Sequence, residues 1–239
     1  MKIIIKEQST GSLVTGIENW PHPKSDKQWK CGRSAMELAK FSLNGPKLSE
    51  LIKKVLTKCN LNNDMDFECY PEYKTSFGTG MGKGGPRVHD MLLVGDGLVI
   101  GVEAKVSEPF DEKIEEKKQG KDKQGKTRAD KLAETLRYSS NLNNENIRYQ
   151  LLTATYGTMK AAIDNNTDKC IMLVVVFKGN VCKEPSYEKN CKNNDSDFNS
   201  FCNFVNLQEG RIVRSIKDKK ITCWIKKVEV EISTDYILC

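Results

Sequence analysis

The chain has 239 residues, of which 38% are hydrophobic and 29% are charged, and its formal net charge is +6. This composition is typical of a globular protein with a sizeable core, and the absence of any apolar run near ~18 residues excludes a membrane span. The opening apolar run is too short for a signal peptide, so we expect a cytoplasmic protein. The modest positive charge favours an anionic partner without identifying it.

Nine cysteines are spread along the chain at irregular intervals, and no two form a Cys-X-X-Cys pair. This spacing does not predict a zinc site. In a cytoplasmic protein the thiols are expected to be reduced.

The first half of the chain predicts a short strand, two helices and a second strand. The strand is expected at residues 2–5, and the prolines in 19–24 indicate a loop. Apolar residues recur at helical spacing in two stretches, from Ser34 to Ser42 and from Lys47 to Lys58. Residues 67–77 alternate well enough to form a strand.

Residues 90–105 form two apolar runs joined by Asp96-Gly97, a dipeptide that favours a two-residue hairpin turn. Such a turn places Gly95 opposite Leu98, and counting outward brings Asp90 opposite Glu103, roughly 5 Å away. Lys105 emerges on the same face as Glu103 because side chains alternate along a strand.

The second half of the chain starts with a polar stretch at 111–131, interpreted as a mobile excursion or a solvated helix start. Helices are expected at 129–138 and 147–163, and a strand buried on both faces at 171–177. The remainder predicts a polar loop at 179–196, a helix at 197–207 and an edge strand at 221–232. With no linker or repeat visible, we expect one domain over residues 1–239.

Two carboxylates held close together repel each other unless a cation lies between them. The predicted pairing of Asp90 with Glu103 therefore favours a site for a divalent metal. The alternative is a surface salt-bridge cluster, but Glu103 ends an apolar strand, where a buried charge is costly.

These residues resemble the PD-(D/E)XK nuclease superfamily, in which an acidic residue on one strand precedes Glu-X-Lys on its antiparallel neighbour. The matching positions are Asp90, Glu103 and Lys105, although His89 stands where the superfamily often has proline. The chain is also similar to a group of uncharacterised bacterial proteins near this superfamily. The segments that carry this similarity are Trp29-Lys-Cys-Gly-Arg-Ser-Ala-Met-Glu-Leu-Ala, Glu103-Ala-Lys-Val-Ser-Glu-Pro-Phe and Arg148-Tyr-Gln-Leu-Leu, so it spans about residues 20–180.

The resemblance implies an α/β fold with a restriction-endonuclease-like core of order α-β-β-β-α-β. The mixed sheet of this core is flanked by helices. The core would occupy about residues 30–180, and residues 181–239 would add a C-terminal helix and strand.

The resemblance also implies a Mg²⁺-dependent deoxyribonuclease, with Mn²⁺ as a substitute metal, and a role in restriction or defence would fit the superfamily. Asp90, Glu103 and the backbone carbonyl of Ala104 would hold the metal. Lys105 would position the attacking water and stabilise the transition state. DNA is the expected partner. The oligomeric state stays undecided. Many members of the superfamily cut both strands as dimers, which makes a homodimer an option, but the sequence shows no recognisable interface.

Two further catalytic candidates come from the helices. The resemblance places an acidic residue on the first core helix near the metal, which points to Glu37. Glu37 is equally compatible with a solvated position, or with a capping box in which Ser34 is the N-cap. Gln150 would lie near the substrate phosphate, or else on an amphipathic helix surface.

The rival function is a catalytically inactive nuclease fold that binds nucleic acid or protein. Retention of Asp90, Glu103 and Lys105 together favours the enzyme. The basic residues between 113 and 128 could follow a phosphate backbone, but interleaved acidic residues also fit a solvated face.

Overall fold

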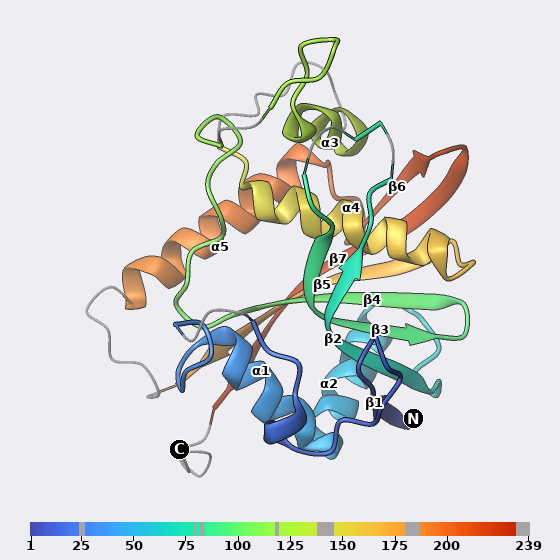
Figure 1. The fold of residues 1–239 in the computed structure, drawn as a ribbon, viewed down its shortest axis with the longest axis vertical. Helices are drawn as coiled ribbons and strands as arrows, with labels where there is room; N and C mark the ends of the chain where they lie inside the picture. The colour runs from blue at the N-terminus through green and yellow to red at the C-terminus, as the bar shows by residue number, and fades with distance from the viewer. Residues whose placement is uncertain are drawn as a thin grey trace.

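The computed structural model describes residues 1–23, 27–78, 80–81, 84–117, 120–137, 146–179 and 187–232. Within these ranges the chain forms a seven-stranded mixed sheet with strand order β1-β2-β3-β4-β5-β7-β6 (Figure 1). The strands are β1 Ile3–Ile5, β2 Phe67–Thr75, β3 Arg87–Gly95, β4 Leu98–Lys105, β5 Lys169–Lys178, β6 Arg211–Ile216 and β7 Lys219–Glu231.

The helices cover both faces of the sheet (Figure 1). Helices α1 (Ser34–Leu43) and α2 (Gly45–Lys58) pack on one face, and α3 (Arg128–Leu136), α4 (Tyr149–Asp164) and α5 (Tyr187–Phe204) on the other. A short 3-10 helix, Ile17–Asn19, contacts α1. The expectation of an α/β protein with a mixed sheet between helices is confirmed.

The predicted hairpin between β3 and β4 is also confirmed. Gly95 pairs with Leu98 across the Asp96-Gly97 turn, in which Gly97 has a φ of +70° and Asp96 keeps a negative φ, so the turn is not the expected type I′. The antiparallel ladder continues to Met91 and Val102 and ends there, whereas β4 runs on beside β5 as far as Lys105. On the side of the Met91–Val102 pair away from the turn, the start of β3 and the end of β4 therefore separate.

Strand β4 lies at the centre of the sheet and all its residues are buried. It pairs in parallel with β5, whose apolar run from Ile171 to Phe177 is buried on both faces as predicted. Helix α4 crosses β4 at Gly101, where an added Cβ would lie 2.1 Å from Thr158 Oγ1. The missing side chain at Gly101 thus sets how closely α4 approaches the sheet.

Two expectations for the C-terminal part need correction, one of them only in part. Helix α5 begins at Tyr187, so residues 187–196 are helical and do not form a loop. Its buried face consists of Asn194, Phe198, Phe201 and Phe204, so tertiary packing outweighs the polar local sequence.

Strand β7 is not an edge strand in its first half, where β6 pairs with Lys219–Trp224 and β5 lies on the other side. Beyond Trp224 its ladder within the described ranges is with β5 alone, so the edge prediction holds for that half. The missed strand β6 joins β7 through Lys217 and Asp218, which both adopt positive φ (+47° and +64°). Such a turn is usually signalled by Asn-Gly or Asp-Gly, and neither dipeptide is present here.

In the described ranges no helix combines the length and apolar character needed to cross a bilayer. Six of the cysteines in these ranges are free thiols: Cys59, Cys69, Cys170, Cys191, Cys202 and Cys223. The expectation that all thiols are reduced is wrong for Cys31, which is disulfide-bonded.

Candidate active site

A cleft of about 540 Å³ opens where β3 and β4 separate. It lies between the start of α1, the ends of the central strands and the start of α4. Its polar lining includes the predicted residues Asp90, Glu103, Lys105 and Gln150, together with Arg33, Ser34, Glu72, Glu108 and Asp111.

Asp90 is held at the point where the hairpin opens. Its Oδ2 accepts a hydrogen bond of 2.7 Å from the amide of Ala104. Ala104 has no backbone partner on β3, and the Asp90 carboxylate accepts from its amide instead. Burial and the negative charge of Glu103 raise the pKa of Asp90 to about 7, although Lys105 and Arg87 act in the opposite direction. The cost of burying the Asp90 carboxylate beside Glu103 therefore outweighs the stabilisation that the nearby cations Lys105 and Arg87 give it.

Glu103 is almost fully buried, with 1% of its surface exposed. Its Oε2 forms an ion pair with Arg87, and its Oε1 accepts from Gln150 and lies 3.1 Å from Lys105 Nζ. This carboxylate thus has two cations and one amide around it, which balances the cost of burying its charge.

Lys105 and Gln150 are fixed by their other contacts. The Lys105 side chain is also nearly buried, and its Nζ lies over the ring of Phe110 at 5.4 Å. Gln150, on the first turn of α4, accepts from the Asp111 amide at 3.2 Å while it donates to Glu103. Lys105 on β4 and Gln150 on α4 therefore contact the same carboxylate, that of Glu103, from a strand and from a helix.

Glu72 is a third carboxylate in the cleft, and the sequence reasoning missed it. The register of β2 and β3 places Glu72 opposite Asp90, between the pairs Pro71–Met91 and Tyr73–His89. Glu72 has a φ of +50°, a left-handed conformation that costs energy for a residue with a Cβ. Burial and the charges of Asp90 and Glu103 raise its pKa to about 7.

Arg87 was also missed as part of the site, and His89 lies next to it under α4. Arg87 is the second cation on Glu103, and the buried ring of His89 bonds Thr75 through Nε2 and Oγ1 at 3.1 Å. Burial and the charge of Arg87 keep the pKa of His89 well below its usual value. Both side chains fit because α4 carries Gly157, where a Cβ would lie 3.0 Å from Arg87 and 3.1 Å from His89.

No local sequence pattern marks these three residues. Glu72 lies inside an ordinary alternating strand, and a left-handed glutamate has no sequence signature.

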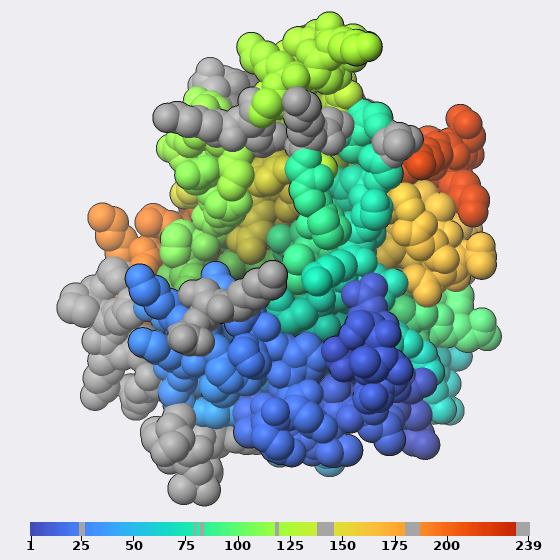
Figure 2. Space-filling view, in the orientation of Figure 1, coloured from blue at the N-terminus to red at the C-terminus, as the bar shows by residue number. Residues whose placement is uncertain are grey.

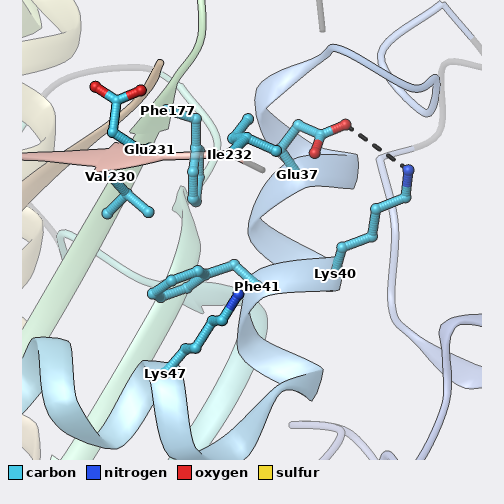
Figure 3. A pocket seen from close by; sticks show the side chains of 8 residues that line it. All are labelled: Glu37, Lys40, Phe41, Lys47, Phe177, Val230, Glu231 and Ile232. Atoms are coloured by element: carbon cyan, nitrogen blue, oxygen red, sulfur yellow. Dashed lines mark ion pairs between the residues drawn. The ribbon is translucent and has the colours of Figure 1, made fainter. Parts of the chain in front are cut away.

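The structure does not bring Glu37 into the cleft. Glu37 lines a small hollow with Lys40, Phe41 and Phe177 on the α1 side of the molecule (Figure 3). Its Oε1 accepts from the Gly32 amide at 2.8 Å and lies 3.8 Å from Lys40 Nζ.

The predicted capping box at the start of α1 is wrong as well. The N-cap residue is Arg33, and Glu108 accepts hydrogen bonds of 2.9 Å from the amides of Ser34 and Val106. A carboxylate from the loop after β4 therefore caps α1 and attaches it to the cleft.

Among the described residues, no group of three or more His, Cys, Asp or Glu side chains is arranged to hold a metal ion. The candidate donors are the oxygens of Asp90 and Glu103. The Ala104 amide is already committed to Asp90, and ligation by the Ala104 carbonyl stays a prediction.

Comparison with known proteins gives one match. Residues 14–232 match the model of a family described as a domain of unknown function, DUF6946. The chain belongs to the DUF6946 family. No curated protein and no solved structure matches the chain. All cleft residues lie inside the part that defines DUF6946, so the site belongs to the family domain and not to an appendage.

Proposed function

We propose that this DUF6946 chain is a divalent-metal-dependent nuclease that hydrolyses phosphodiester bonds in DNA. The observation that carries the proposal is the meeting of Asp90, Glu103 and Lys105 in one cleft, at the point where two central strands separate. The element order from α1 to β5 is α-β-β-β-α-β once the additional helices α2 and α3 are set aside, and this order supports a restriction-endonuclease-like core.

The donor set fits a hard divalent cation, because such ions prefer carboxylate oxygens. The raised pKa values of Asp90 and Glu72 support this fit, since burial first and neighbouring carboxylates second disfavour their charged forms, and a bound cation would favour them. Asp90 and Glu103 are the residues that would hold the metal. When bound, Mg²⁺ or Mn²⁺ would lower the pKa of a water molecule and offset charge on the phosphate.

The protein's own groups supply orientation and charge. The Ala104 amide fixes Asp90, and Gln150 fixes Glu103 from the other side of the cleft. Lys105 presents a nearly buried ammonium group beside Glu103. In a site shielded from water, this charge stabilises negative charge that develops on a phosphoryl oxygen.

The assay uses pure protein with supercoiled, linear and single-stranded DNA in the presence of Mg²⁺ or Mn²⁺. We expect metal-dependent cleavage of at least one substrate and none by Glu103→Ala. Equal cleavage by wild type and variant would overturn the assignment of the site.

A binding module without catalysis is the second candidate. It is favoured by the ion pairs of Glu103 with Arg87 and Lys105, which neutralise this carboxylate without any metal. The same assay separates the two functions, because binding of DNA without cleavage under every condition would select the module.

A further inference from the structure

Arg87 lies between the cleft and a second hollow. Its guanidinium forms an ion pair with Glu103, and its side chain is 13% exposed. The same residue lines a neighbouring hollow of about 540 Å³ together with Gly84, Gly85, Pro86, Arg128, Tyr149 and Thr153. In Figure 2, gold atoms of α4 form the floor of this hollow, between the green segment after β4 and the teal segment around β3.

The ion pair leaves part of Arg87 unsatisfied. Its Nε is buried and has no hydrogen-bond acceptor among the described residues. A buried donor without an acceptor costs about 1–3 kcal/mol. The present position of Arg87 therefore leaves one of its guanidinium donors without an acceptor among the described residues.

The Glu103 carboxylate cannot keep its ion pair with Arg87 and also coordinate a metal ion without a loss to one of the two interactions. Its Oε2 already contacts Arg87, and its Oε1 already contacts Lys105 and Gln150. A divalent ion bound to Glu103 would add a like charge within a few ångströms of Arg87, which is strongly repulsive in a buried site. Metal and Arg87 therefore compete for one carboxylate.

The second hollow suits an anion. Arg128 donates hydrogen bonds of 2.7 Å to the carbonyls of Gly84 and Gly85, so it holds the turn that leads into Arg87. The carboxylate of Asp111 also lines the hollow, but it is neutralised by Lys117 at 2.7 Å. A guanidinium that faced this space could bind a phosphate through paired N–H groups.

We propose that Arg87 exchanges partners: it is the counter-ion of Glu103 in the metal-free protein, and it binds a substrate phosphate group when a divalent cation takes Glu103. This inference rests on the proposed nuclease function and adds a residue that couples metal binding to substrate binding. Arg87 is thus a competitor of the metal and a ligand of the nucleic acid.

The test measures two affinities of Arg87→Gln, with the exposed arginine variant Arg211→Gln as matched control. Calorimetric titration with Mn²⁺ should give an affinity about tenfold higher than wild type, because a competing cation is gone. Binding of a short DNA duplex at saturating Mn²⁺, measured by fluorescence anisotropy in a Lys105→Met background, should be about tenfold weaker. Arg211→Gln should change neither affinity.

Arg87→Lys provides a second variant that keeps the charge and hence the fold. Its Mn²⁺ affinity should stay within about twofold of wild type, while its DNA affinity falls because lysine lacks the paired donors. Unchanged or weaker Mn²⁺ binding by Arg87→Gln would overturn the proposed partner exchange of Arg87 and leave the proposed metal site standing. Failure of both wild type and Arg87→Gln to bind Mn²⁺ would overturn the exchange and the proposed metal site together.

Discussion

The amide of Ala104 donates to Asp90 Oδ2 at 2.7 Å, immediately beyond the last backbone pair of the β3–β4 hairpin. A side chain thus replaces a backbone acceptor where the two strands separate. This bond fixes Asp90 beside Glu103 although each carboxylate repels the other.

The first prediction concerns the pH dependence of stability. Folding raises the pKa of Asp90 from 3.8 to about 7, so the folded state binds the proton more tightly than the unfolded state. The resulting penalty is absent below pH 3.8, grows as the pH rises and is complete above about pH 7. Asp90→Asn should therefore raise the melting temperature at pH 8 by about 4 °C, or about 1–2 kcal/mol, and leave it unchanged at pH 4.

Differential scanning calorimetry at both pH values measures this effect. Asparagine retains an oxygen that can accept from Ala104, so the hydrogen bond is kept and only the charge is removed. An equal shift at pH 4 and pH 8 would contradict the electrostatic explanation.

The second prediction concerns the backbone at Glu72. Glycine tolerates the φ of +50° and alanine does not, so Glu72→Gly should be more stable than Glu72→Ala by about 1 kcal/mol. Both variants lose the carboxylate and should show the same reduced Mn²⁺ affinity. Urea unfolding and calorimetric titration measure the two quantities, and a more stable alanine variant would show that Glu72 is not strained.

Much of the site could be predicted from sequence because its two central strands form a local hairpin. The Asp96-Gly97 turn fixes the register as far as the Met91–Val102 pair, and Asp90 and Glu103 are the next residues along the two strands, so their proximity needs no distant contact. Lys105 then follows from alternation along one strand. The amphipathic helices and the buried strand β5 were predictable for the same reason, since each depends on a short periodic pattern.

The remaining site residues depend on contacts between segments distant in the sequence. Glu72 reaches the cleft through an unusual backbone conformation, and Arg87 through the space that Gly157 leaves on α4. Glu37 had the right residue type on the right helix, but its carboxylate turns back to the amide of Gly32. None of these outcomes has a local signal.

The third prediction tests the approach of α4 to the sheet. Gly101→Ala places a methyl group 2.1 Å from Thr158 Oγ1 and should cost about 1–3 kcal/mol of stability. Adding Thr158→Ala should restore part of that loss. Unfolding of the two single variants and the double variant forms a cycle, and a coupling energy of zero would contradict the contact.

The fourth prediction separates Glu37 from the proposed catalytic residues. Glu37→Gln keeps an acceptor for the Gly32 amide, so cleavage and melting temperature should stay near wild type. Glu37→Ala leaves a buried N–H without its acceptor and should lower stability by about 1–3 kcal/mol. Loss of cleavage in a stable Glu37→Gln protein would place Glu37 in the reaction after all.

Cleavage of DNA by Lys105→Met tests the central claim most directly. Methionine replaces the nearly buried ammonium group with an apolar side chain, while Asp90 and Glu103 stay in place to bind metal. Initial rates at saturating Mn²⁺ should fall by about 10²–10³ relative to wild type, with Mn²⁺ affinity at least as high as in wild type because a cation beside Glu103 is removed. Wild-type rates in the purified variant would contradict a nuclease centred on Asp90, Glu103 and Lys105.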